Sequence, residues 1–406
     1  MKLSINKNFF LTLLLIYTST QSSVLSFSYY TTLLFLLIAI YFFLKDGLKL
    51  DSLYIKFSIL FFLINLYLYF SLPQFDFFLT VYIYIKFLYA YISIKVIGVS
   101  FFKNVVRIAY YGCIISFPFF IFQLVNFDLT FNFVGFFQNS IDFLAFRNDT
   151  FANNIIFTVN SAAPLRNSGF MWEPKGFSNF IIIATFFRFA LNGLKIDQKI
   201  IVFVLAIITT FSTAGFLALF LLFTFYYLNK NFKVLITIFP IFLISSLLIF
   251  FNSNFLYEKI MFELSLEDEY KTLLYEKTDY KSDTYSLGRT GSFLVDFNDA
   301  VKRPIIGYGF TKENRTQSSF VKLIRVNGFS DLFVVYGFVG LILYFYRQHI
   351  FLKLLQKNMR YKYSFLILLT LLVIYFASTL TAHPFWMSFI FLSVILQKNK
   401  KNLLYE

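Results

Sequence analysis

The chain has 406 residues, of which 58% are hydrophobic and only 14% are charged, and its mean hydropathy is +0.70. A soluble globular chain carries about 25% charged residues, so this composition excludes an ordinary soluble protein. Apolar stretches of about 17–20 residues, the length that crosses a bilayer, recur from end to end of the chain. The composition therefore predicts an all-α polytopic integral membrane protein.

The charge balance and the single cysteine exclude further classes. A net charge of +15 would suggest a nucleic-acid partner in a soluble protein, but basic cytoplasmic loops explain it in a membrane protein, so no nucleic acid is expected. Cys113 is the one cysteine, which rules out an intramolecular disulfide. The first apolar run lacks a small-residue cleavage site, so we expect a retained helix and not a signal peptide.

Twelve membrane helices are predicted from the hydropathy. They lie near residues 9–26, 30–44, 57–72, 77–95, 108–125, 177–193, 200–212, 215–228, 234–251, 329–346, 364–380 and 383–397. The stretch 200–228 is long for one span and short for two, and we divide it at "FSTAG", where Ser212, Thr213 and Gly215 interrupt the apolar run.

The distribution of basic residues supports the count of twelve. With both termini in the cytoplasm, the segment 347–363 and the tail after 397 are basic and cytoplasmic, while the short outer turns carry no Lys or Arg. Reading 200–228 as one span would place 347–363 outside.

Five parts follow from this topology. Residues 1–125 hold membrane helices 1–5, 126–176 form a first long periplasmic loop, 177–251 hold helices 6–9, 252–327 form a second long periplasmic loop, and 328–406 hold helices 10–12 and a cytoplasmic tail. The second loop carries acidic and basic residues in equal number. Loops of this length are usually functional or disordered.

The stretch "RNSGFMWEPKGFSNF", residues 166–180, is the first candidate site. Pro174 suits the first turn of a helix, which places Glu173 at the cap on the outer membrane surface. The helix dipole, Arg166 and Lys175 would together bind an anion, and Glu173 would be a held carboxylate that acts as a base or binds sugar hydroxyls. In the alternative, Glu173 is an ordinary cap and the cations meet lipid headgroups.

The second candidate is "SLGRTGSFLVDFNDAVKRPIIGYGF", residues 286–310. Arg289 opens a short amphipathic stretch, and Arg303 leads to a turn at Gly307 and Gly309 that would expose backbone N–H groups. Because guanidinium binds phosphate oxygens bidentately, Arg166 and Arg289 on two outer loops could hold one diphosphate between them. The alternative is a solvated amphipathic helix followed by a glycine turn.

Two further features each have a functional and a structural explanation. Asn327 lies at the outer mouth of a helix with Gly337 and Gly340, where capping and close helix packing are the alternative explanation. Lys86 lies near the middle of a predicted span, which favours a functional role, although snorkelling explains it equally well. The chain has no phosphate-binding glycine loop, no CxxC and no HExxH motif, and its two histidines are too few for a histidine metal cluster.

Together these stretches resemble the O-antigen polymerase/ligase superfamily of bacterial envelope proteins. The order of parts carries the resemblance: Arg166, Gly169, Glu173 and Pro174 before a middle helix, Ser212, Thr213 and Gly215 at a split, then Arg289, Pro304, Gly307, Gly309 and Asn327. Ligases typically have Arg after the Ser of the split and His before the last Asn. Thr213 and Val326 stand there, which favours the repeat-unit polymerase branch.

The resemblance implies an enzyme that uses oligosaccharides on undecaprenyl diphosphate at the outer face of the inner membrane. The growing O-antigen or capsular polysaccharide would move from its lipid carrier onto the non-reducing end of a new lipid-linked unit. Neither a nucleotide nor a metal would be required, since the diphosphate is the leaving group. Membrane lipids and a chain-length regulator protein are the expected partners. Arg166, Arg289 and Glu173 would be catalytic, and Lys175, Arg303, Gly307, Gly309 and Asn327 would bind substrate.

Two alternatives stay open. An O-antigen ligase would differ only in its acceptor. A lipid-linked oligosaccharide flippase or another exporter would also have twelve spans, but it should line its interior with charge, and transporters commonly show repeated halves.

Overall fold

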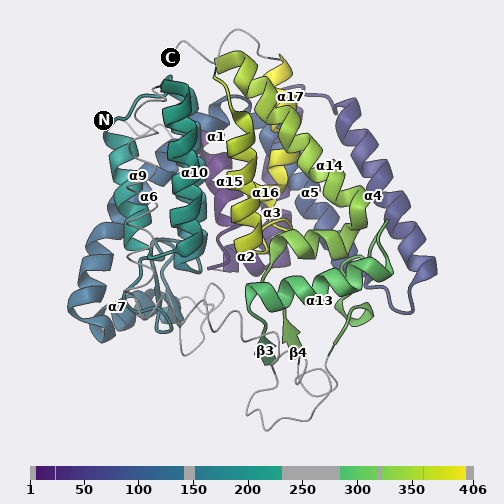
Figure 1. Ribbon diagram of the computed structural model, residues 1–406, viewed down its shortest axis with the longest axis horizontal. Helices are drawn as coiled ribbons and strands as arrows, with labels where there is room; N and C mark the ends of the chain where they lie inside the picture. Colours follow the sequence, from purple (N-terminus) through teal and green to yellow (C-terminus); the bar gives the residue numbers. More distant parts are fainter. Residues whose placement is uncertain are drawn as a thin grey trace.

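Helices build nearly all of the molecule (Figure 1). The computed structural model describes residues 6–22, 24–140, 151–230, 284–317, 322–359 and 361–398. The helices of the first part are α1 (Lys7–Tyr17), α2 (Val24–Phe27), α3 (Tyr29–Lys45), α4 (Ser52–Ser71), α5 (Phe77–Ile97), α6 (Ser100–Val125) and α7 (Phe127–Ser140).

The later helices follow the first long loop. They are α8 (Pro174–Leu191), α9 (Gln198–Thr209), α10 (Thr213–Lys230), α13 (Arg289–Lys302), α14 (Gly328–Met359), α15 (Ser364–Ala377), α16 (Pro384–Met387) and α17 (Leu392–Lys398). Two small sheets accompany them: β1 (Phe151–Asn153) pairs antiparallel with β2 (Thr158–Asn160), and β3 (Thr284–Ser286) pairs parallel with β4 (Lys322–Ile324).

The helical membrane protein predicted from composition is confirmed. Within the described residues, five helices are long and apolar enough to cross a bilayer, namely α4, α5, α6, α10 and α14. The predicted span 234–251 lies outside the described residues. Large apolar side chains that face outward on these helices, such as Phe62 and Ile342, form a surface suited to lipid.

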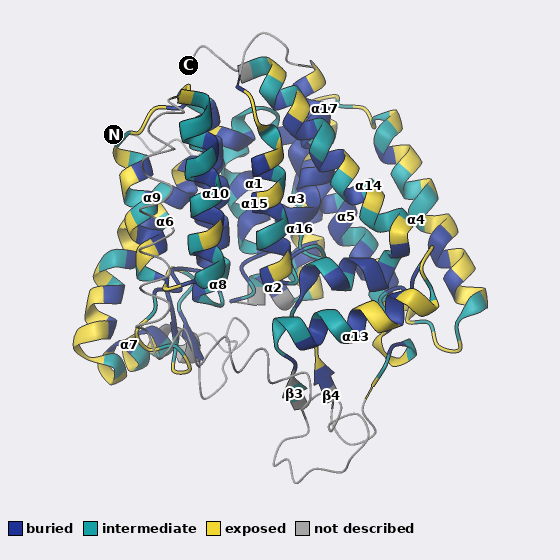
Figure 2. Cartoon of the chain, viewed as in Figure 1, coloured by how far each residue is buried: buried dark blue, intermediate teal, exposed yellow. Residues whose placement is uncertain are grey.

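The core of the bundle lies around α5, α8 and the chain from α16 to α17 (Figure 2). α8 is buried on most of its faces, because Phe, Ile, Ala and small polar residues follow one another around it without a charged stripe. α4 differs, since only 17% of its most apolar window is buried. It therefore stands at the edge of the bundle.

Two predicted spans are shorter than expected. The helix predicted at 9–26 ends at Tyr17, because hydroxyl groups of the following residues bind backbone carbonyls of its last turn: Thr18 Oγ1 donates to the Leu15 carbonyl and Thr20 Oγ1 to the Tyr17 carbonyl. The helix predicted at 383–397 is divided into α16, a 3₁₀ turn at Ser388–Ile390, and α17.

The predicted break at "FSTAG" is confirmed as a helix break. α9 ends at Thr209 and α10 begins at Thr213, with Phe211 between them in the left-handed region at φ 45°. Gly215 lets α10 approach α8 closely, because a Cβ there would lie 2.7 Å from the Ser178 Oγ.

α14 is longer than predicted and is bent. The basic segment that we expected to be a loop from residue 347 continues the helix to Met359. Gly337 breaks the helical geometry at φ 63°, and the carbonyls of Pro304 and Ile305 accept hydrogen bonds from Phe338 N and Val339 N just after the bend. The bend in α14 therefore binds the chain segment that follows α13.

Both predicted long loops contain regular structure. The first holds α7 and the β1–β2 hairpin, which pack together. The second holds α13 at the predicted amphipathic stretch, but its faces are mixed: Asp296 and Asp299 are buried beside Val295, while Phe297 and Val301 face outward. In Figure 1, α13 lies across the lower end of the bundle. Residues 252–283 lie outside the described residues.

Candidate functional site

Four helix ends meet at the end of the bundle where α13 lies. A pocket of about 80 Å³ is lined by residues after α1, at the start of α8, after α15 and within α16. A single water needs roughly 10–15 Å³ on this measure, so the pocket has room for a larger polar group. Its lining includes Ser19, Thr20, Gln21, Trp172, Glu173, Lys175, Ser378, Thr379 and Trp386.

Glu173 stands at the mouth of α8 but does not cap it. Its backbone is extended at φ −133°, Pro174 occupies the first helical position, and its side chain makes no cap hydrogen bond. The carboxylate instead pairs with the Lys175 Nζ at 3.0 Å and keeps 39% of its side-chain surface exposed. The side chain therefore provides no cap, and the carboxylate remains within reach of a bound molecule.

Arg166 is held by the break between α9 and α10. Its Nε donates to the Thr210 carbonyl at 2.9 Å. The backbone N of the next residue, Asn167, donates to the carbonyl of Thr209, the last residue of α9. Gly169 then turns the chain at φ +51°, where a Cβ would lie 2.5 Å from the Phe177 ring. The turn at Gly169 thus brings Arg166 near enough to Glu173 for their charges to interact.

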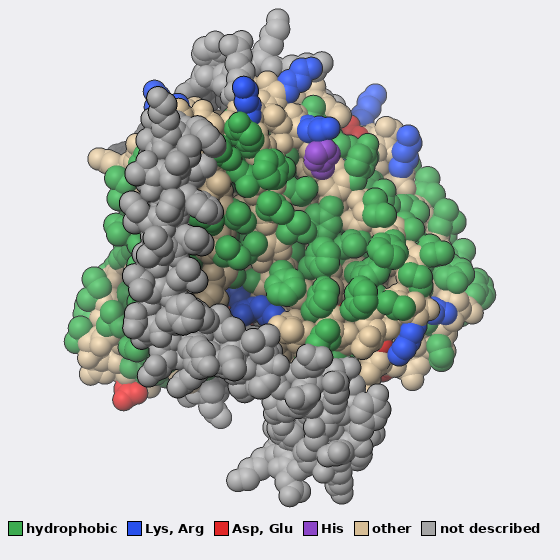
Figure 3. All heavy atoms as spheres, viewed as in Figure 1, with side chains coloured by type: hydrophobic (Ala, Val, Ile, Leu, Met, Phe, Trp, Pro, Cys, Tyr) green, Lys and Arg blue, Asp and Glu red, His purple; other side chains and the backbone are tan. Residues whose placement is uncertain are grey.

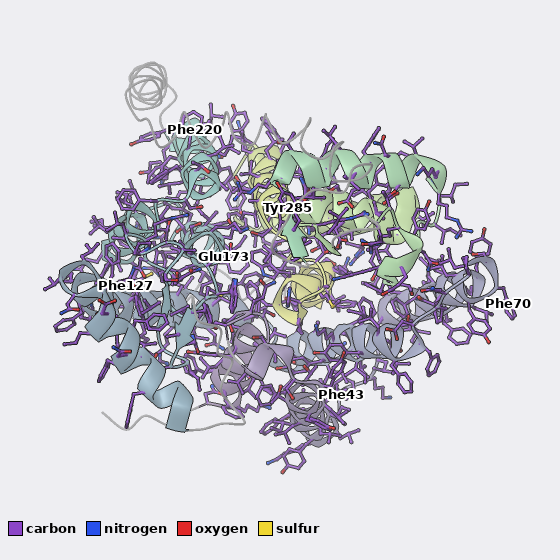
Figure 4. The ribbon with its side chains drawn as sticks, turned by 90° about the horizontal axis from the view of Figure 1, so that it is seen from below. Phe43, Phe70, Phe127, Glu173, Phe220 and Tyr285 are labelled. Atoms are coloured by element: carbon purple, nitrogen blue, oxygen red, sulfur yellow. The ribbon has the colours of Figure 1, made fainter. Side chains whose placement is uncertain are left out.

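Arg289 reaches the same place from the second long loop. It is the first residue of α13, and its Nε lies 3.4 Å from the Ala377 carbonyl at the end of α15. The Asn327 side-chain amide donates to the Arg289 carbonyl at 3.3 Å, which fixes the start of α13 against the start of α14. Seen from the α13 end, Glu173 projects near the middle of the molecule (Figure 4).

The electrostatics confirm that these charges influence one another. Burial would raise the pKa of the Glu173 carboxyl, but the positive charges of Lys175, Arg289 and Arg166 outweigh burial and hold that pKa below its usual value. Burial lowers the pKa of the Arg166 guanidinium, Glu173 raises it, and the positive charge of Arg289 lowers it again, with a net lowering. Among the described residues, Lys175, Arg289 and Arg166 thus all act on the one carboxylate of Glu173.

An apolar groove begins at Arg289. It has a volume of about 470 Å³ and runs between α10 and α15, with Leu217, Leu372 and Phe376 among its walls. Figure 3 shows basic side chains at the lower edge of the apolar surface on this side of the molecule. A cation at the end of a lipid-facing groove suits a ligand with an apolar chain and an anionic head.

The structure separates Arg303 from the other predicted site residues. Its guanidinium donates to the Ser71 carbonyl at 2.9 Å and stacks near the Tyr308 ring, so it lies at the end of α4. The physical reason is the length of α13, since Arg289 and Arg303 stand at opposite ends of a 14-residue helix.

The prediction that Gly307 and Gly309 expose N–H groups is wrong. The N–H groups of Gly307, Tyr308 and Gly309 donate to the carbonyls of Arg303, Val334 and Val335. Both glycines have positive φ, and a Cβ on Gly307 would lie 2.3 Å from the Val334 carbonyl oxygen, so the turn serves to pack against α14.

Asn327 has the capping role that was the alternative explanation. It is fully buried, and its Oδ1 accepts hydrogen bonds from Phe329 N and Ser330 N at the start of α14. Its contact with Arg289 makes it a positioning residue.

Several lining residues were missed from sequence. Ser19, Thr20 and Gln21 were predicted inside the span 9–26, and Ser378 and Thr379 inside the span 364–380. One signal was available, because the chain has only two Trp residues and both line this pocket. His383 contacts Gln21 through their side chains. Lys86 is buried at 7% exposure beside the Tyr82 ring, 4.4 Å from its centroid, which excludes snorkelling to the surface.

Among the described residues, no three His, Cys, Asp or Glu side chains gather as a metal site would require. No protein-family model matches this chain, and neither a curated protein nor a solved structure does so.

Proposed function

We propose that this protein is a polysaccharide polymerase of the bacterial inner membrane. It transfers the growing O-antigen or capsular glycan from undecaprenyl diphosphate onto a new lipid-linked repeat unit at the periplasmic face. The observation that carries the proposal is the convergence of Arg166 and Arg289, from two separate loops, beside Glu173.

The chemistry of the transfer matches the charges of the site. The acceptor hydroxyl oxygen attacks the anomeric carbon of the donor, the bond from that carbon to the diphosphate breaks, and the diphosphate leaves with the electron pair. Arg166 and Arg289 stabilise the negative charge that develops on the diphosphate, which is where electrostatic catalysis is most effective. The hydroxyl proton leaves with the polyprenyl diphosphate, so the atoms balance without an oxidant or a nucleotide.

Glu173 orients the acceptor in this scheme. Its lowered pKa makes the carboxylate a weak base but a permanent hydrogen-bond acceptor at neutral pH. Lys175 at 3.0 Å fixes its position. Trp172 and Trp386 line the pocket together with hydroxyl and amide groups, a combination that suits sugars.

The groove at Arg289 supports a lipid-borne donor. Its walls on α10 and α15 are largely apolar, and Arg289 is among its lining residues. A polyprenyl chain in this groove would present its diphosphate to Arg289, whose charge acts on Glu173.

The function is tested with purified full-length protein in proteoliposomes and undecaprenyl-diphosphate-linked repeat units. We expect a ladder of products that increases by one repeat unit per step. Movement of unchanged lipid-linked units across the bilayer would instead identify a flippase, and transfer only to a lipid A–core acceptor would identify a ligase. Either result would reject the polymerase.

The twelve-span topology with both termini in the cytoplasm is part of the proposal. In a Cys113→Ala background, we expect an impermeant maleimide to label Ala162→Cys from the periplasm. Lys49→Cys, at the opposite end of the bundle, should be labelled only after the inner membrane is permeabilised. Both positions are exposed. The reverse pattern would place the Glu173 site in the cytoplasm and would reject the proposed substrate.

A further inference from the structure

The pocket at Glu173 and the groove at Arg289 are separate cavities that meet at the end of α15. Ala377 lines the groove, and the next residue, Ser378, lines the pocket. In the described part of the chain, the groove is lined by one arginine and mostly apolar side chains, whereas hydroxyl and amide groups line much of the pocket and no arginine does. A donor whose diphosphate lies at Arg289 therefore leaves the pocket open to the sugar of the acceptor.

Gln21 is the unusual residue in the wall of this pocket. Its neighbours are buried and tied to the chain before α8. The Thr20 carbonyl accepts a hydrogen bond from Trp172 N at 3.0 Å. The Ser22 Oγ donates to the Phe170 carbonyl at 2.8 Å. Gln21 between them is half-buried, lines the pocket and has a left-handed backbone at φ 58°, which is uncommon for a residue other than Gly.

Strained backbone of this kind concentrates at binding and active sites, where the surrounding structure holds it. The two hydrogen bonds on either side of Gln21 supply that hold. They fix the backbone in a conformation from which the Gln21 side chain reaches the pocket. The local structure thus presents one amide to the cavity.

His383 holds this amide in place. The Gln21 Nε2 donates to the His383 Nε2, in the turn before α16. The other ring nitrogen, Nδ1, is buried and has no hydrogen-bond partner among the described residues. Buried polar atoms are usually paired when a side chain serves only the fold. The ring is therefore oriented towards Gln21 at the expense of its second nitrogen.

The remaining groups of the amide suit a sugar hydroxyl. A Gln side chain has two N–H donors and a carbonyl acceptor, and His383 takes one of the donors. The other N–H and the Oε1 can pair with a hydroxyl, which both donates and accepts. Glu173 in the same pocket can only accept while it is ionised. The two side chains thus offer different contacts to two hydroxyls of one sugar.

We infer that Gln21 binds a hydroxyl of the non-reducing terminal sugar of the acceptor, and that His383 is a positioning residue that orients Gln21. The inference rests on the proposed function. Glu173 then orients the hydroxyl that attacks, and Gln21 determines which sugar is accepted. A site built to hydrogen-bond a hydroxyl discriminates strongly against a sugar that lacks it.

Tryptophan fluorescence tests the pocket without turnover, because the chain has two Trp residues and both line it. The probe is the organism's own repeat-unit oligosaccharide, released from its lipid and both phosphates. It is titrated into the purified full-length protein in detergent, and it binds independently of Arg289 because it has no diphosphate. We expect a saturable change in fluorescence. The same oligosaccharide without its non-reducing terminal sugar should give none.

Gln21→Gly removes the amide and suits the left-handed backbone, so the variant should fold normally. Its affinity for the oligosaccharide should fall about tenfold, as expected for the loss of one or two hydrogen bonds. In the transfer reaction, it should raise the concentration of repeat unit needed for half-maximal rate and leave the maximal rate unchanged, because the contact is the same in the ground state and the transition state.

Two variants of His383 separate positioning from a role in the fold. Gln places a polar group where the imidazole has Nε2, and Asn places one where it has Nδ1. His383→Gln should keep the affinity, whereas His383→Asn should lower it about 2- to 10-fold, because the Gln21 side chain must then be ordered on binding. His349→Asn is the matched control, since it removes the other histidine, which is half-buried on α14.

Normal affinity in Gln21→Gly, equal affinities of His383→Gln and His383→Asn, or unchanged binding of the shortened oligosaccharide would overturn the inference. Equilibrium dialysis with radiolabelled oligosaccharide measures the same affinities independently of fluorescence. Binding needs no turnover, so the two proposals fail separately. Polymer formation without oligosaccharide binding by either method rejects the sugar site alone. Binding that depends on Gln21 in a protein that forms no polymer rejects the polymerase and leaves a sugar site.

Discussion

Two charged clusters lie at the same end of this molecule and behave in opposite ways. In the first, one carboxylate, Glu173, is surrounded by cations and keeps 39% of its side chain exposed. In the second, one guanidinium, Arg325, binds two carboxylates, Asp296 at 2.6 Å and Asp299 at 2.9 Å, and all three are buried. The first cluster is partly open to a bound molecule, while the second is closed and its charges are paired within the fold.

The pKa values show the same contrast. The cations around Glu173 hold the pKa of its carboxyl below the usual value. Burial raises the pKa of Asp296 to about 6, even though Arg325 opposes the shift. Ser330 Oγ donates to Asp296 and Thr316 N donates to Asp299, so the closed cluster is already supplied with partners. A partly exposed carboxylate beside described cations can contact a ligand, whereas a closed cluster with its partners in place holds α13.

The largest effect is expected in the closed cluster. Arg325→Ala leaves Asp296 and Asp299 buried without their cation, and removing one partner of a buried ion pair typically costs about 3–5 kcal/mol. Thermal unfolding of the purified protein in detergent measures this loss. Lys302→Ala is the matched control, because Lys302 is 64% exposed and lies 3.9 Å from Asp299. Equal unfolding temperatures for the two variants would show that the closed cluster does not hold α13.

A smaller effect is expected from Glu173→Gln. The amide keeps the size of the side chain but loses the charge, and a hydrogen bond to a charged group contributes about 1.5–3 kcal/mol. The transfer rate should therefore fall about 10- to 100-fold, while the unfolding temperature should fall only slightly, because the variant loses a part-exposed ion pair with Lys175 and no cap bond. Glu173→Asp is the companion variant, which keeps the charge and shortens the reach. A Gln enzyme with normal turnover would remove Glu173 from the site.

The smallest effect is expected from pH. The folded-state pKa of Glu173 is lowered, so its ionised form and the stability that it contributes are complete above the usual value of 4.5 and are lost only as pH falls below it. The transfer rate should show no Glu173-dependent change between about pH 5.5 and 8. An acidic limb in this range that disappears in Glu173→Gln would mean that the carboxyl titrates as a base with a raised pKa.

Much of the fold followed from hydropathy, because long apolar runs leave the chain few alternatives in a bilayer. The break between α9 and α10 was also visible, since Ser212, Thr213 and Gly215 interrupt an apolar run. The early end of α1 was not, because Ser and Thr are tolerated in membrane helices and only their hydrogen bonds to the last turn mark the end. Because this helix end was not predicted, Gln21 was not recognised from the sequence as a residue that lines the pocket.

The candidate site was predictable only in part. The approach of Arg289 to Glu173 depends on how α13 sits on α14, which no local pattern encodes. The glycine turn at Gly307 and Gly309 was misjudged for a related reason. Positive φ can be inferred from glycine, but whether the N–H groups face a ligand or the bend at Gly337 depends on tertiary packing.

The most direct test of the open cluster is the rate of a single glycan transfer by purified Arg289→Ala at saturating lipid-linked substrate. Loss of one group that stabilises developing charge typically slows a reaction 10²–10³-fold. We predict a loss of about that size with an unchanged unfolding temperature, and a partial return in Arg289→Lys, because a point charge lacks the bidentate geometry of guanidinium. A normal transfer rate in Arg289→Ala would contradict the assignment of the diphosphate to this cluster.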